Sequence, residues 1–169
     1  MISPLSSAPA RTAASRAAMP VHAMRQTAMP DPAKTSDVQQ LARRARALAD
    51  AGHLTEALAY CNQWAAADKL DPAGYYLRAV ILQEQGQLEQ ARIALQSALY
   101  LNPEFVLAHF ALGCLVRRCG RPAESRRHFA NARQLLRRCR PDASLPESDG
   151  LSAGRLAEIL SSFAEDEIA

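Results

Sequence analysis

The sequence has few aromatic residues and no long apolar run. Phe, Trp and Tyr make up 5% of its 169 residues, with a single Trp, whereas apolar residues in total make up 49%. Such a composition suits helices that pack closely in a linear stack better than one large globular core. Because no run reaches the roughly 18 apolar residues of a transmembrane helix, we expect no membrane insertion.

The sequence also has none of the usual signatures of catalysis or metal binding. Its cysteines show neither a Cys-x-x-Cys spacing nor a histidine at ligand distance, and they are Cys61, Cys114, Cys119 and Cys139. We interpret them as unpaired thiols in a reducing, cytoplasmic compartment. The four histidines are scattered without acidic or Cys partners at suitable spacings, and no glycine-rich phosphate loop follows a strand. We therefore predict no catalytic residue, metal or cofactor, and a protein that is not an enzyme.

What the sequence does contain is a repeat of 34 residues. Two sets of positions keep this interval: the glycines Gly52, Gly86 and Gly120, and five residues later the small residues Ala57, Ala91 and Ser125. This period is the signature of the tetratricopeptide repeat, in which two antiparallel helices are joined by a tight turn. A glycine at the turn can adopt the left-handed conformation, and the small residue lets the second helix approach the first closely. The predicted fold is an all-α tetratricopeptide-repeat superhelix of three helix pairs with a C-terminal capping helix.

Composition and proline positions set the expected boundaries. Residues 1–36 contain five prolines and no apolar period, so we expect a disordered leader or linker. Three tetratricopeptide repeats follow over residues 37–140, with Asp37 as the first N-cap and Pro122 at a first helical position. Residues 141–150 are expected to form a loop, residues 151–163 a capping helix, and residues 164–169 an acidic tail. The apolar face of that helix comprises Leu151, Leu156, Ile159, Leu160 and Phe163.

Charge is unevenly distributed near the C-terminus. Residues 117–140 carry a net charge of +8, and residues 141–169 carry −6. The positive segment contains nine Arg and one Glu, and we call it the Arg cluster. Three interpretations of it stay open: a solvated face, a site for an acidic peptide or protein, and an intramolecular latch with the acidic tail. Nucleic acid is not expected as a partner, because aromatic residues are not interleaved with the cluster and the chain as a whole is barely basic.

Two segments are not demanded by repeat geometry. Residues 98–113 contain Tyr-Leu-Asn-Pro and Ala-His-Phe, and residues 145–156 contain Glu-Ser-Asp-Gly-Leu. Together they resemble the C-terminal tetratricopeptide region of bacterial chemoreceptor methyltransferases. In that family a catalytic domain that binds S-adenosylmethionine precedes the repeats, whereas here 36 low-complexity residues precede them. The resemblance therefore implies the repeat module and a chemosensory context, without the catalysis.

The first helices of such repeats line a concave groove, which is the candidate binding surface. Counting from the glycines places ten residues there: Arg46, Asp50, Tyr76, Val80, Gln83, Glu84, Phe110, Cys114, Arg117 and Arg118. Tyr76 and Phe110 are 34 residues apart and so occupy equivalent positions. They either offer aromatic surface to a peptide or simply pack between helices.

Two functions are consistent with these features. The first is a non-catalytic protein–protein interaction module in bacterial chemosensory signalling. The alternative is the regulatory part of a receptor-glutamate methyltransferase whose catalytic domain lies elsewhere, and a generic assembly chaperone is a third possibility. In each case the expected partner is a protein or peptide, acidic if the Arg cluster binds it.

Overall fold

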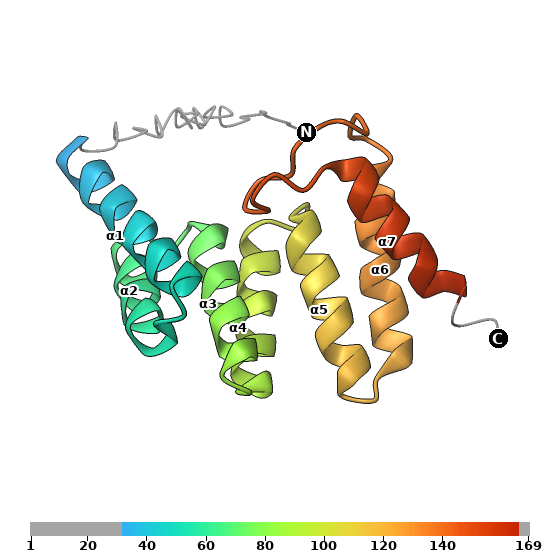
Figure 1. Cartoon of the computed structure of the whole chain (residues 1–169), viewed down its shortest axis with the longest axis horizontal. Coiled ribbons are helices and arrows are strands. Elements are labelled where there is room, and N and C mark those ends of the chain that lie inside the picture. Colours follow the sequence, from blue (N-terminus) through green and yellow to red (C-terminus); the bar gives the residue numbers. More distant parts are fainter. Residues whose placement is uncertain (1–31, 166–169) are drawn as a thin grey trace, which may run out of the picture. The chain divides into compact units, whose positions relative to one another are not determined.

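A computed structural model describes residues 32–165 of the chain, which form seven helices (Figure 1). The helices are α1 (Pro32–Asp50), α2 (Leu54–Ala67), α3 (Pro72–Glu84), α4 (Leu88–Leu101), α5 (Val106–Arg118), α6 (Pro122–Leu136) and α7 (Ala153–Glu165). Each odd-numbered helix from α1 to α5 packs on the helix that follows it, and the three pairs stack in chain order, with α7 against α6. This arrangement confirms the all-α tetratricopeptide superhelix and its C-terminal capping helix.

The three turn glycines have the backbone conformation that the sequence predicts. Their φ angles are +78°, +74° and +73° for Gly52, Gly86 and Gly120. In each turn the residue after the glycine donates its N–H to a carbonyl five residues earlier, as Gln87 does to Leu82 at 2.8 Å. This bond closes a helix C-terminus in the Schellman arrangement, which needs the positive φ that glycine accepts without steric cost.

The small residues after each turn pack where two helices cross. Ala57, Ala91 and Ser125 are each 0% exposed. In the third repeat the close approach also requires Gly113 of α5, because a Cβ there would lie 2.5 Å from Cε1 of Phe129 on α6. Close helix crossings, rather than a large aromatic core, therefore bury the apolar surface.

The start of the first helix differs from the prediction. Helix α1 begins at Pro32, so Asp37 lies inside the helix and is not its N-cap. Proline is favoured in a first helical turn, where its missing N–H costs no hydrogen bond. Pro32 was instead counted among the five prolines that suggested a disordered leader, so the predicted start of the helix was five residues too late. Pro122 does begin α6, as predicted. The leader residues 1–31 and the tail residues 166–169 lie outside the described residues.

The segment between α6 and α7 is folded more tightly than the loop that the sequence suggests. Ser144 and Ser152 form an antiparallel bridge, and Leu145 donates its N–H to the Leu151 carbonyl at 2.9 Å. The Ser148 hydroxyl donates to the Leu145 carbonyl at 2.6 Å and closes the turn from inside. Leu145 is 6% exposed and belongs to the main core. We refer to residues 141–152 as the hairpin.

Helix α7 covers the end of the third repeat, as predicted. Leu156 and Leu160 are both 0% exposed, and Arg133 of α6 donates to the Leu160 carbonyl at 3.1 Å. The apolar stripe of α7 is thereby buried, and the stack has the terminal cap that repeat arrays need.

Candidate functional site

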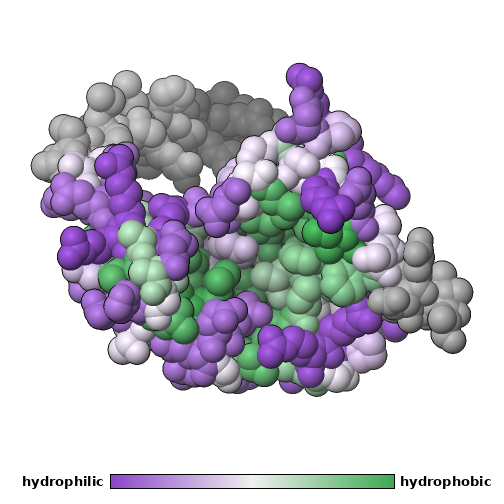
Figure 2. Space-filling view, viewed as in Figure 1, coloured by the Kyte–Doolittle hydropathy of each residue, from purple (hydrophilic) through white to green (hydrophobic). Residues whose placement is uncertain are grey.

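The candidate surface consists of two matching stripes on α3 and α5 and continues to Arg46 of α1, and we call it the inner face. On α3 the stripe is Tyr76, Val80 and Gln83, and on α5 it is Phe110, Cys114 and Arg117. Both follow the i, i+4, i+7 spacing of one helix face, and all six residues are half-buried. Figure 2 shows apolar surface gathered over α3 and α5 between hydrophilic margins. Position along the repeat thus places six of the ten predicted residues on a partly open surface.

One end of the inner face is covered by the capping helix. The Phe163 ring of α7 lies 6.2 Å from the Phe110 ring, centroid to centroid, and is stacked on Phe129 at 5.2 Å. The Arg117 guanidinium lies over the same Phe163 ring at 5.0 Å. Phe110 is therefore a half-buried member of an aromatic cluster with Phe129 and Phe163, an arrangement that corresponds to the packing alternative of the sequence analysis.

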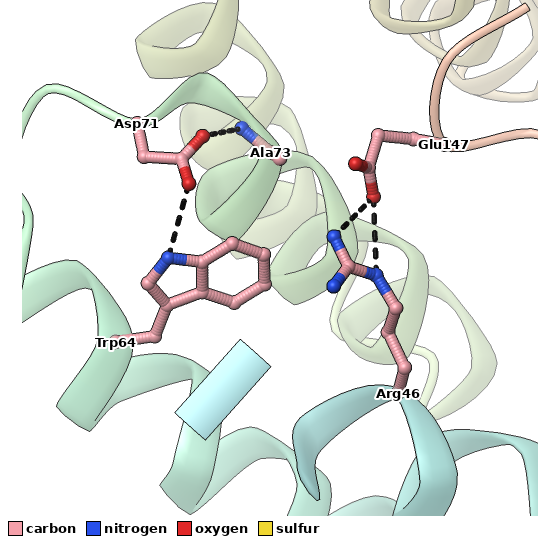
Figure 3. A network of polar contacts seen from close by, with 5 residues as sticks. All are labelled: Arg46, Trp64, Asp71, Ala73 and Glu147. Atoms are coloured by element: carbon pink, nitrogen blue, oxygen red, sulfur yellow. Dashed lines mark hydrogen bonds and ion pairs between the residues drawn. The ribbon is translucent and has the colours of Figure 1, made fainter. Parts of the chain in front are cut away.

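At the other end, Arg46 of α1 lies in a network of polar contacts (Figure 3). Its guanidinium is stacked 5.0 Å from the centroid of Trp64 and donates to Glu147 of the hairpin, 2.6 Å from Nη2 and 3.2 Å from Nε to the same Oε2. The Trp64 indole donates to Asp71 at 3.1 Å, and Asp71 also caps α3 through the Ala73 N–H at 2.9 Å. The Trp64 ring beneath Arg46 is therefore held by its own helix, α2, and by the N-terminus of α3.

Tyr76 lies between this network and the core. Its ring contacts Phe105 at 5.0 Å, centroid to centroid. Burial, reinforced by the nearby negative charges of Glu147 and Asp149, raises the pKa of the Tyr76 hydroxyl to about 12. Two hairpin carboxylates therefore lie close to the predicted binding residue Tyr76.

The remaining predicted residues are exposed near the turns. Asp50, Glu84 and Arg118 occupy equivalent positions at the ends of α1, α3 and α5, and all three are exposed. They form a charged margin of mixed sign. A partner on the inner face would meet these groups at its edge.

One pair of residues was missed by the sequence analysis. His109 on α5 and His128 on α6 approach with their Nδ1 atoms 3.2 Å apart, and His109 Nε2 donates to the Pro103 carbonyl at 2.9 Å. That bond fixes the proton of His109 on Nε2, so His128 donates from Nδ1 to His109. Burial lowers the pKa of both, and His109 adds to the lowering at His128. Their offsets from Gly120, eleven before and eight after, place them roughly opposite across an antiparallel pair, a signal that could have revealed the contact.

The cysteines differ in their surroundings. Cys61 is fully buried between α1 and α2, and burial raises the pKa of its thiol to about 11, so the group is a packing residue. Cys114 is half-buried on the inner face, and burial raises its pKa as well. Within residues 32–165 no group of three or more His, Cys, Asp or Glu side chains is placed to hold a metal ion. None of the described helices is long and apolar enough to cross a membrane.

Comparisons with known proteins support the repeat assignment. A family model described as tetratricopeptide repeat matches residues 72–105, which contain α3 and α4. No curated protein matches the sequence at a significant level. The family match over α3 and α4, together with the three stacked helix pairs, shows that the fold is that of a tetratricopeptide-repeat protein.

Solved structures with this fold cover most of the described region. The translocator chaperone SycD of Yersinia enterocolitica type III secretion matches 80% of this chain and 95% of its own, with a TM-score of 0.68 and 15% identity. A double mutant of MamA from strain RS-1 shares 27% identity over 60% of this chain, with a TM-score of 0.57, and the chain spans 57% of that protein. The second tetratricopeptide domain of Spaghetti (RPAP3), bound to the HSP90 peptide SRMEEVD, matches 61% of this chain and 97% of its own, with a TM-score of 0.58 and 18% identity. These matches do not address the resemblance to chemoreceptor methyltransferases.

Proposed function

We propose that this protein is a non-catalytic interaction module that binds a segment of a partner protein on its inner face. The observation that carries the proposal is the pair of matching stripes on α3 and α5, which hold apolar and polar side chains half-exposed over two repeats. Apolar and aromatic groups bordered by charge are typical of surfaces that recognise peptides. The peptide complex of Spaghetti gives a precedent for ligand binding by this fold.

We place this module in bacterial chemosensory signalling on the strength of the two segments that repeat geometry does not require, residues 98–113 and 145–156. The alternative, a regulatory part of a receptor-glutamate methyltransferase encoded elsewhere, depends on the same resemblance. Titration of the chain with S-adenosylmethionine by calorimetry tests the non-catalytic assignment. Micromolar binding would contradict it.

Affinity capture from the native host, with mass spectrometry, would identify the partner, and variants would then locate its site. We expect Tyr76→Ala to weaken binding about tenfold, or about 1.4 kcal/mol. Tyr75→Ala is the matched control, because Tyr75 lies on the same helix but borders a different hollow, which Ile93 and Tyr100 of α4 also line. Arg118→Glu, at the margin of the face, should also weaken binding. Its control is Arg126→Glu, an exposed position on α6.

Arg133 would be a poor control for such charge reversals, since it donates to a carbonyl of α7.

If Tyr75→Ala abolished capture and Tyr76→Ala did not, the partner would bind at the hollow between Tyr75 and Tyr100, and the proposed site would be wrong.

A further inference from the structure

The hairpin reaches across the stack to the first repeat. Glu147 belongs to the segment that follows the last repeat, yet its carboxylate pairs with Arg46, 101 residues earlier in the chain. Two residues without the freedom of glycine take positive φ there, Glu147 at 63° and Asp149 at 50°. Such conformations are uncommon outside glycine and persist where the surrounding structure enforces them. The tip of the hairpin is thus held in an unusual conformation that directs its acidic side chain to one guanidinium.

The hairpin is anchored independently of that ion pair. Leu145 is buried in the core and donates its N–H to the Leu151 carbonyl, while Gly154 donates to the Pro141 carbonyl at 2.9 Å. The Arg46–Glu147 pair is more open, with the two side chains 38% and 24% exposed. A pair at this level of exposure contributes little to stability and can exchange with a competing carboxylate.

Arg46, in contrast, is organised to receive a carboxylate. Its guanidinium lies on the Trp64 ring, which is itself packed against Gly74: a Cβ at Gly74 would lie 3.2 Å from the indole. The Asp71 bond holds the other edge of the ring. Because the planar fork is already oriented, less side-chain freedom is lost when an anion binds.

We propose that the hairpin is an internal occupant of the inner face and that Glu147 takes the place of an acidic side chain of the partner. A partner segment with a Glu or Asp would displace Glu147 from Arg46 and extend over Tyr76 onto the stripes of α3 and α5. This inference depends on the proposed function and names the chemistry of the ligand, an acidic peptide. It also predicts that the free protein resists binding until its own carboxylate is displaced.

The single tryptophan provides a local reporter, because Trp64 lies directly beneath Arg46. The probe is a synthetic peptide of residues 143–152, Ala-Ser-Leu-Pro-Glu-Ser-Asp-Gly-Leu-Ser, titrated into the full chain while the Trp64 indole resonance is followed by NMR. A second peptide with Gln in place of its Glu is the matched control. The proteins are wild type, Glu147→Gln, Arg46→Gln and the double variant, each checked for unchanged helicity.

We expect the Glu peptide to bind Glu147→Gln about fivefold more tightly than wild type, because the internal competitor is removed. The Gln peptide should bind Glu147→Gln more weakly than the Glu peptide does. The double variant, which also carries Arg46→Gln, should lose the fivefold increase in affinity for the Glu peptide. Any one of three results would overturn the proposal. These are equal affinity of wild type and Glu147→Gln for the Glu peptide, an undiminished affinity in the double variant, and no change in the Trp64 resonance of Glu147→Gln. If these negative results occurred while partner capture still depended on Tyr76, the proposed function would stand and only this inference would fail.

Discussion

The crossing of α5 and α6 offers a sharp test of the packing. Gly113 faces the Phe129 ring, and a Cβ added there would lie 2.5 Å from Cε1, 2.6 Å from Cδ1 and 3.2 Å from Cζ. The ring cannot move aside easily, since Phe129 is 2% exposed and packs against both Phe110 and Phe163 in a cluster of three rings. We therefore expect Gly113→Ala to destabilise the protein, although alanine is the better helix former.

Two opposing free-energy terms set the size of this effect. Overpacking a core by one methyl group costs about 1–3 kcal/mol, whereas alanine in place of a helical glycine gains about 1 kcal/mol. Because the new Cβ would lie only 2.5 Å from a buried ring, the overpacking cost falls in the upper part of that range, about 2–3 kcal/mol. The net expectation is a loss of about 1–2 kcal/mol in the free energy of unfolding. For a domain of this size that loss corresponds to a melting temperature about 5 °C lower.

Thermal and urea unfolding followed by circular dichroism measure this change, and a second background isolates its cause. In Phe129→Leu the ring edge that meets the new Cβ is absent, so the same Gly113→Ala change should become stabilising by up to about 1 kcal/mol. A Gly113→Ala protein as stable as wild type, or a loss of equal size in both backgrounds, would refute the steric explanation.

Two further perturbations test the fold. Ala91→Glu would place a charge at a helix crossing that is 0% exposed, so we expect a loss of several kcal/mol and an unfolded circular dichroism spectrum, whereas Gln90→Glu at the exposed neighbouring position should melt like wild type. The pair His109 and His128 should make stability depend on pH. The folded state lowers both pKa values, so the unfolded chain binds more protons as the pH falls below about 6.5. The neutral histidine pair therefore contributes its full share of the free energy of unfolding above that pH, and this contribution is lost as the pH falls through the folded pKa values. Urea midpoints should therefore decrease from pH 7 to pH 5.5 in wild type and less steeply in His128→Gln, and parallel decreases would contradict this assignment.

The parts of the fold that could be predicted are those that a local rule determines. Gly86 needs no distant contact to end α3, because positive φ and the Schellman bond involve only its own turn. The burial of Ala91 follows from the same register. The start of α1 was misplaced because Pro32 and Asp37 are both acceptable helix starts, and the sequence alone did not decide between them.

The parts that could not be predicted depend on contacts distant in sequence. A loop composition was evident for residues 141–150, but the burial of Leu145 depends on a core cluster, which also contains Phe105, that only the assembled helices create. The Arg46–Glu147 pair joins the first repeat to the segment after the last one. Nothing in a 34-residue period specifies where such a segment returns.

The chemical character of the inner face arises where the repeats differ from one another. Positions 46, 80 and 114 are equivalent in the three repeats, and they hold Arg46, Val80 and Cys114. A stack of identical repeats would present the same group three times, whereas among these three equivalent positions only position 46 holds a guanidinium. The hairpin supplies its carboxylate to this position, and the stripes of α3 and α5 follow from there. A ligand that pairs its acidic group with Arg46 is therefore held at that end of the face, because the equivalent positions of the next two repeats offer Val80 and Cys114 in place of a cation.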